Sequence, residues 1–504
     1  MRRLLAAFLG FALVSGLFTG ALPASSTVIS LAEGTDTQAA FFDPLKVSTV
    51  NLSKASDGPD LTWDNLNTTD YQRANISIIT ADGATTNLNE IGVRLKGQAS
   101  RGAAKMPLKI KFDAFVTGQK FMGLKRMTLN NMVQDPTMIH ESTVYRLYRA
   151  AGIPAPRTSY AKVFIDGNYY GLYLNIESID KEFAQRWFPS TQHIYSGPYN
   201  CDVVVGVSDC YEAGIGDPLV RTDLNHAASY SNLHGLAWWT AINTVADMPT
   251  IIKLMATDVL IANWDGYTDA VQNNHSVHFD DTGVLTIIPW GMDQSLSDPY
   301  GSIGSIDRYM TWDGNGPLFR GWGNHRSTMF DHCIEYAPCK TKFIQAGIYV
   351  SGLINSINLF GYESQMASVV NNSNYIDGDL SGNNISNMQA NQAQINPFIR
   401  HRQSVLTTYL YNNSLLPFTL SPTPRISGTT RVTYTLTATA GTWDFGTTTT
   451  YQWFRSGVKI TGATKRTYRL VSLDRGKRIT VRVTGTKAHY APVTKASAAT
   501  AAIR

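Results

Sequence analysis

The sequence is poor in charged residues and cysteine, and it lacks long basic or apolar runs. Only 16% of its 504 residues are charged, and the formal net charge is +5. Without a basic run to neutralise phosphates, the composition gives no sign of nucleic-acid binding. Beyond the N-terminus, no segment reaches the roughly 18 uninterrupted apolar residues of a membrane-spanning helix. We therefore expect neither a nucleic-acid partner nor a transmembrane anchor. With 43% hydrophobic residues, the chain is long enough for two or more domains.

The first 25 residues have the pattern of a secretory signal peptide. Arg2 and Arg3 form a positive start, residues 4–17 an apolar stretch, and small residues at 21–25 a cleavage region. Residues 26–45 are small and polar, which is typical of a flexible lead-in. We expect an exported protein, secreted or associated with the cell surface.

The four cysteines form two close pairs, Cys201/Cys210 and Cys333/Cys339. Export favours disulfides, and among the three possible pairings we expect the two local ones. A zinc site with four cysteine ligands is the alternative, but neither pair has the C-x₂-C spacing that is usual for one.

The stretch from residue 258 to 298 contains most of the candidate chemistry. An apolar helical run ends at Asn263, and Asp265 follows in an Asp-Gly break. Two strand-like runs, 276–279 and 284–288, are joined by a turn sequence and predict a β-hairpin.

This hairpin would place Asn274 beside Pro289, and so bring Asp265, Asn274 and Asp293 to one point. An acid, an amide and a second acid suit Mg²⁺, or Mn²⁺, bound to nucleotide phosphates. The remaining acid can take a proton from an attacking hydroxyl. Protein-kinase-like phosphotransferases use this order of catalytic Asp, metal Asn, hairpin and metal Asp. The alternative is that Asp265 is only a turn former.

A basic strand lies in the N-terminal half, within the segment GVRLKGQASRGAAKMPLKIKFDAF that begins at Gly92. Between residues 108 and 112, apolar residues alternate with Lys109 and Lys111, which predicts a half-buried strand with one basic face. The loop at 97–104 consists mostly of small residues and can bring backbone N–H groups close to phosphates. It has no Walker spacing, and a surface hairpin with solvated lysines is the alternative.

A helix is predicted next, with Asp135 as its N-cap. Its Glu141 falls on the stripe that faces the core, and a buried acid needs a partner. In a kinase-like layout, a strand lysine followed by a helix glutamate positions the ATP phosphates, so Lys109 and Glu141 come in the right order. Pairing of Glu141 with Arg146 or Arg149 is equally open.

Several of these motifs together resemble the CotH (spore coat protein H) family of atypical kinases. They are NWDG, the paired asparagines before the hairpin, PWGMD, the pattern R-L-K-G…S…K-x-P-x-K-I-K-F, and DGNYYGLYLNIE, which ends at Glu177. The resemblance covers roughly residues 47 to 411. The usual family ending is nearer to PWD-x-D, so Gly291 replaces the first acid and leaves Asp293 as the metal ligand.

The resemblance implies an α+β fold with a two-lobed atypical protein-kinase-like domain over residues 46–416. Such a kinase would use ATP and Mg²⁺, or Mn²⁺, to phosphorylate a protein or a small hydroxylated acceptor. It implies Asp265 as general base, Asn274 and Asp293 as metal ligands, and Lys105 or Lys109 as the phosphate contact. Glu177 would lie near the adenine-side hinge, although a structural salt bridge is equally open.

A linker at residues 417–424 precedes a Thr-rich, alternating tail at 425–504. This tail resembles the small immunoglobulin-like β-sandwich modules of secreted actinobacterial proteins, with Trp453 as its core tryptophan. The module implies a cell-wall or surface partner. An alternative function for the whole chain is a surface adhesin or matrix-binding protein that keeps the kinase-like fold without turnover, since ATP is scarce outside a bacterium.

Overall fold

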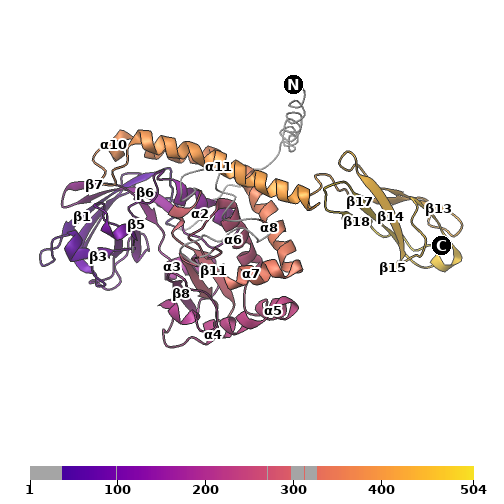
Figure 1. The fold of residues 1–504 in the computed structure, drawn as a ribbon, viewed down its shortest axis with the longest axis horizontal. Coiled ribbons are helices and arrows are strands. Elements are labelled where there is room, and N and C mark those ends of the chain that lie inside the picture. Colours follow the sequence, from indigo (N-terminus) through magenta and orange to yellow (C-terminus); the bar gives the residue numbers. More distant parts are fainter. Residues whose placement is uncertain (1–36, 98, 270, 297–311, 313–325) are drawn as a thin grey trace, which may run out of the picture. The chain divides into compact units, whose positions relative to one another are not determined.

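The computed structural model describes residues 37–504, except 98, 270, 297–311 and 313–325 (Figure 1). The predicted signal peptide and the first part of the predicted lead-in lie outside these residues. The chain is a mixed α/β protein with several small sheets. It divides into two compact units, one reaching to Arg402 and the other running from Gln403 to Arg504.

The first unit begins with a closed barrel in the strand order β1-β2-β3-β4-β5-β7-β6, coloured indigo to magenta in Figure 1. Strands β1 and β2 alternate between buried apolar residues and more exposed ones, and the buried apolar side chains of the barrel form one shared core. Only the closing pair, β1 and β6, is parallel. The strands are β1 (Val47–Lys54), β2 (Gln72–Ile79), β3 (Thr85–Leu95), β4 (Leu108–Lys111), β5 (Arg126–Asn130), β6 (Thr158–Ile165) and β7 (Asn168–Ile176).

The hairpin of β6 and β7 follows directly from its turn residues. Asp166 and Gly167 both have positive φ, 48° and 82°, as a two-residue hairpin turn requires. This Asp-Gly pair therefore forms the turn between β6 and β7.

Helices and a second, four-stranded sheet make up the rest of the first unit. The sheet has the order β11-β10-β8-β9 and contains the predicted hairpin, in which Ser276 pairs with Ile288. Its strands are β8 (His193–Gly197), β9 (Glu212–Ile215), β10 (His275–Phe279) and β11 (Leu285–Pro289). The helices are α1 (Trp63–Leu66), α2 (His140–Ala150), α3 (Lys181–Trp187), α4 (Thr222–Ser229), α5 (Gly235–Ile242), α6 (Met248–Ile261), α7 (Thr328–Glu335), α8 (Ala337–Ser356), α9 (Leu359–Val370), α10 (Ser373–Ile376) and α11 (Ile385–Asn412).

The N-terminus of α2 differs from the prediction. The helix begins at His140 rather than directly after Asp135. Asp135 lies in the preceding loop, where its carboxylate accepts hydrogen bonds from the backbone N–H groups of Thr137 and His140, both at 2.9 Å. Asp135 therefore still binds a free backbone N–H at the start of α2, that of His140, although it lies five residues earlier in the chain.

Both cysteine pairs form the expected local disulfides. Cys201 and Cys210 have Cα atoms 5.9 Å apart, and Cys333 and Cys339 have Cα atoms 4.9 Å apart. The second bridge joins the end of α7 to the first turn of α8. Among the described residues, no single helix is both long and apolar enough to cross a bilayer. Only α8 and α9 taken together reach that length and composition, and they are bent by 55° at their junction.

The second unit contains a three-stranded sheet, β12-β13-β16, and a four-stranded sheet, β15-β14-β17-β18. Side chains from both sheets meet in one apolar core, in which Trp453 is fully buried as predicted. The strands are β12 (Arg425–Ser427), β13 (Thr435–Thr439), β14 (Thr448–Arg455), β15 (Val458–Lys459), β16 (Thr467–Arg469), β17 (Ile479–Thr486) and β18 (Val493–Ala496).

Candidate active site

The loop that carries Asp265 starts at the C-terminus of α6 and is held there by Asp258. This buried carboxylate accepts hydrogen bonds from the side chains of Asn263, Thr268 and Tyr148. Tyr148 belongs to α2, so one acid connects the loop to two helices. The bracing role is structural, and it fixes where the next acid in the loop can lie.

Asp265 is held by the paired asparagines that precede the hairpin. One carboxylate oxygen accepts a hydrogen bond from the Asn273 amide at 3.0 Å, and the other accepts one from the Asn274 amide at 2.8 Å. The pKa of Asp265 is raised to about 6. Burial is the main cause and the negative charge of Asp293 adds to it, while the two amide hydrogen bonds oppose the shift. The carboxylate is therefore more basic than an ordinary aspartate, yet it is ionised at neutral pH.

The hairpin places Asn274 against the segment that follows β11. The Trp290 N–H donates to the Asn274 carbonyl at 2.9 Å. Gly291 has a φ of +62°, and a Cβ atom there would lie 2.7 Å from the Asn274 amide oxygen. An aspartate at this position, as in the usual family ending, would have to adopt a strained backbone and displace Asn274. The glycine lets the amide oxygen face the loop of Asp293.

Asp293 lies in a short 3₁₀ turn, Met292–Gln294, that is tied to helix α2. The Met292 N–H donates to the Glu141 carboxylate at 3.3 Å, and the Gly291 N–H donates to the Tyr145 hydroxyl at 3.0 Å. Tyr145 in turn donates to Glu141 at 3.2 Å. Helix α2 thus fixes the loop that carries Asp293.

The cation that faces these acids is Lys96, directly after β3. Burial lowers the pKa of Lys96, while the negative charges of Glu141 and Asp293 oppose that shift. The pKa of Glu141 is raised to about 7, chiefly by burial and also by the negative charge of Asp293, while the positive charge of Lys96 opposes the shift. Lys96 also reaches the segment that precedes Asp293, because its Nζ atom lies 5.6 Å from the centre of the Trp290 ring. The strand lysine with a resolved electrostatic effect on Glu141 is therefore Lys96.

The side chain of Lys105 forms its contacts away from the site, in the core. Its fully buried ammonium group donates to the Asp379 carboxylate at 2.8 Å and to the Leu172 carbonyl at 2.6 Å. Because this ion pair and hydrogen bond occupy it inside the core, Lys105 is not available to a nucleotide phosphate. The expectation that it contacts phosphate is corrected accordingly.

Lys109 lies beside the site in a cluster of cations on β3, β4 and β5. Burial lowers its pKa to about 8, and the charges of Arg94, Arg126 and Lys96 contribute to the shift. Strand pairing sets Arg94 opposite Lys109. The alternation predicted for this strand is confirmed.

The arginines considered as alternative partners of Glu141 make other contacts. Arg149 donates to the Pro156 carbonyl, and the guanidinium of Arg146 lies 3.8 Å from the centre of the Tyr362 ring. The carboxylate of Glu141 accepts hydrogen bonds from the Asn130 amide at 2.8 Å, the Tyr145 hydroxyl at 3.2 Å and the Met292 N–H at 3.3 Å. Glu141 thus has a full set of partners at the site itself.

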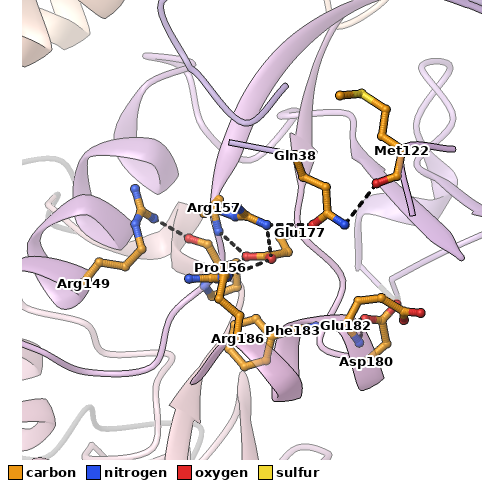
Figure 2. A network of polar contacts seen from close by, with 10 residues as sticks. All are labelled: Gln38, Met122, Arg149, Pro156, Arg157, Glu177, Asp180, Glu182, Phe183 and Arg186. Carbon is orange, nitrogen blue, oxygen red and sulfur yellow. Dashed lines mark hydrogen bonds and ion pairs between the residues drawn. The ribbon is translucent and has the colours of Figure 1, made fainter. Parts of the chain in front are cut away.

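Glu177 takes part in a buried ion-pair network, shown in Figure 2 between Arg157 and Arg186. Arg157 donates to it through its guanidinium at 2.8 Å and through its backbone N–H at 3.0 Å. The Nε atom of Arg186 donates to it at 3.2 Å. Both carboxylate oxygens are used, which supports the salt-bridge alternative for Glu177 over a contact with adenine.

The donor atoms at this point fit a divalent cation. Burial raises the pKa of Glu141, Asp265 and Asp293, and a neighbouring negative charge adds to each shift: that of Asp293 for Glu141 and Asp265, and that of Asp135 for Asp293. Carboxylate and amide oxygens are the ligands that Mg²⁺ prefers. Asp293 and the amide oxygen of Asn274 are therefore suited to hold Mg²⁺, and Lys96 is suited to face its phosphates.

Comparison with known proteins identifies the family of this chain. The family model described as CotH kinase protein matches residues 93–406. Inner spore coat protein H of Bacillus subtilis (strain 168) is 22% identical over 219 residues, which are 40% of this chain and 58% of that protein. The chain thus matches less than two thirds of this relative. Among solved structures, the Helicobacter pylori proinflammatory kinase CtkA is similar with a TM-score of 0.32 and 10% identity, over 61% of this chain and 95% of that one. Because the CotH family model matches well over half of this chain, the chain belongs to the CotH kinase family.

Proposed function

We propose that this protein is a secreted kinase that transfers the γ-phosphoryl group of ATP to a hydroxyl acceptor, a Ser or Thr side chain of an extracellular or cell-surface protein. In this proposal the barrel is the N-terminal lobe of a two-lobed kinase domain, and the second unit is an immunoglobulin-like module. Three contacts around the hairpin carry it. The Asn274 amide donates to Asp265, the Met292 N–H beside Asp293 donates to Glu141, and Lys96 lies over the Trp290 ring.

Each side chain then has a distinct task. Asp265 accepts the proton of the attacking hydroxyl, and the amides of Asn273 and Asn274 hold its carboxylate in one orientation. Lys96 contacts the phosphates, and Glu141 keeps the lysine and the Asp293 loop in position. When bound, Mg²⁺ and ATP supply the phosphoryl group and the positive charge that neutralises it.

Export is proposed from the N-terminal segment and the disulfides. Residues 1–25 have the signal-peptide pattern, and both cysteine pairs are oxidised, which is typical of extracytoplasmic proteins. The direct test of the function is incubation of the purified protein with γ-labelled ATP, Mg²⁺ or Mn²⁺, and candidate protein and polyol acceptors. Label on an acceptor supports the kinase. No transfer to any acceptor, with nucleotide bound, would favour the adhesin.

Lys96→Met and Lys105→Met are expected to have different effects, because Lys96 serves phosphoryl transfer and Lys105 serves stability. Lys96→Met removes a phosphate contact, so the rate of phosphoryl transfer by the folded protein should fall on the order of 10²–10³-fold. Lys105→Met leaves Asp379 buried without its cation, which should cost about 3–5 kcal/mol of stability, while the protein that stays folded keeps its rate. Urea unfolding and initial rates per folded molecule, measured on both variants, check this. A folded Lys96→Met with the wild-type rate, or a stable, inactive Lys105→Met, would reverse the assignment.

Deletion of residues 420–504 should leave phosphoryl transfer in place and abolish attachment to a cell-wall or surface partner. The reason is that these residues lie in a separate compact unit with its own apolar core. Transfer rates and a cell-wall pull-down, each compared with the full chain, measure the two effects. A truncated protein that does not fold would show that the boundary is misplaced.

A further inference from the structure

A cluster of two histidines and a glutamate lies outside the proposed active site. His234 is the N-cap residue of α5, and His332 and Glu335 are one turn apart on α7, so they share a helix face. One ligand atom from each side chain lies within 4.8 Å of the other two. The His234 ring and the Glu335 carboxylate are already 3.1 Å apart.

The burial of His332 sets this cluster apart from an ordinary surface ion pair. His332 is only 5% exposed, and its Nδ1 atom has no hydrogen-bond partner among the described residues. Buried polar atoms are normally satisfied, and coordination of a metal is one way to satisfy this nitrogen. The side chains of His234 and Glu335 are 65% and 60% exposed, so the cluster is open to solvent on one side.

The surroundings hold the buried ligand in place. The Trp238 ring meets the His332 ring edge to face, with centroids 5.2 Å apart. Directly after His332, the disulfide of Cys333 with Cys339 fixes the end of α7 to α8. A rigid inner ligand with two mobile outer ligands can close around an ion without moving the backbone.

We propose that His234, His332 and Glu335 form a binding site for a zinc-class transition-metal ion. Two imidazoles and one carboxylate are the donor set of open zinc sites, which leave a fourth position to water or another ligand. Donors around a tetrahedral zinc ion lie about 3.3 Å apart, so side-chain rotation of His234 and Glu335 has to close the present spacing. A bound ion would tie the start of α5 to the end of α7.

The donor chemistry also separates this site from the one proposed for Mg²⁺. Imidazole nitrogen suits Zn²⁺, Cu²⁺ and Ni²⁺, whereas Mg²⁺ prefers oxygen ligands such as those of Asn274 and Asp293. The zinc site therefore stands whether or not the protein proves to be a kinase.

Calorimetric titration of the chelator-treated full chain with ZnCl₂, in excess Mg²⁺, tests the proposal. We expect one zinc ion per chain, and at least roughly tenfold weaker binding in His234→Ala and in Glu335→Gln, since even outer-sphere changes have effects of that size. Both side chains are exposed, so neither change threatens the fold, whereas His332→Ala removes a buried ring. With Co²⁺ in place of Zn²⁺, the wild type should show the visible absorption of a four-coordinate ion.

Two matched controls make the result specific. His226→Ala removes an exposed histidine that already bonds the Tyr230 hydroxyl, and Asp293→Ala removes the proposed Mg²⁺ ligand. Both should bind zinc as the wild type does. Absence of stoichiometric zinc binding by the wild type, or unchanged zinc binding in His234→Ala and Glu335→Gln, would overturn the site.

Discussion

Asp293→Ala is expected to abolish Mg²⁺-dependent ATP binding while the protein stays folded. Asp293 is the acid proposed, with the Asn274 amide oxygen, to hold the ion, and the side chain of Asn274 also donates to Asp265. Asp293 itself is held through backbone contacts of its neighbours with α2, which the substitution leaves in place. Calorimetry with Mg²⁺ and ATP, on protein whose fold is checked by circular dichroism, measures the effect.

Asp293→Ala is also expected to change the pH dependence of stability in the absence of Mg²⁺. Asp293 contributes to raising the pKa of Asp265 to about 6 and that of Glu141 to about 7. An acid whose pKa is raised by folding contributes stability below its ordinary pKa, and this contribution is lost as pH rises through the folded pKa. The wild type should therefore lose stability between about pH 4 and pH 7, and Asp293→Ala should lose less.

Urea unfolding at pH 5 and at pH 7.5 compares the two proteins, with the exposed Asp57→Ala as the matched control. Asp57 lies in a loop after β1, where its loss should change neither nucleotide binding nor the pH dependence of stability. If Asp293→Ala binds Mg²⁺ and ATP with wild-type affinity, Asp293 is not a metal ligand.

Local sequence signals predicted the hairpin region well. The turn that follows Phe279 and the two short strand-like runs beside it defined the pairing, and the pairing by itself brings Asn274 next to the start of the Asp293 loop. Because the register of a hairpin depends on residues only a few positions apart, a single sequence was sufficient.

The lysine that lies at the site could not be predicted from local sequence in the same way. Alternation shows which residues share a strand face, but it does not show which point of a closed barrel faces the hairpin loop. The partner of Lys105, Asp379, lies on a distant loop after α10, and nothing in the local pattern links the two. Lys96 was within the R-L-K-G motif, and its place at the strand end, before a loop of small residues, was the signal that could have identified it.

An Asn-rich stretch gives a second example. The asparagines of residues 371–396 predict a loop, because asparagine has a low helix propensity, but α11 begins inside this stretch, at Ile385. Met388 and Ile395 are buried on this helix, so packing of apolar side chains outweighs the propensity of their polar neighbours. Tertiary burial of this kind cannot be read from composition.

Asp265→Asn is expected to slow phosphoryl transfer on the order of 10²–10⁴-fold and to leave the affinity for Mg²⁺ and ATP close to normal. The amide keeps the size of the carboxylate and removes its charge and its ability to accept a proton. Because a general base acts on the acceptor hydroxyl, its loss should affect the chemical step far more than nucleotide binding. Single-turnover rates and calorimetric affinities, measured on the same preparation, separate the two effects.

The pH dependence of the rate provides the control for this assignment. The base acts only when deprotonated, and the pKa of Asp265 is raised to about 6, so the wild-type rate should rise with pH through this region. Asp265→Asn should lack that rise, whereas Asp281→Asn, the same change at the exposed tip of the hairpin, should keep both rate and profile. Equal rates in the wild type and Asp265→Asn would remove Asp265 as the base. A parallel loss of ATP affinity would instead make it a ligand of the nucleotide-bound ion, and the proton would then have to pass to another group.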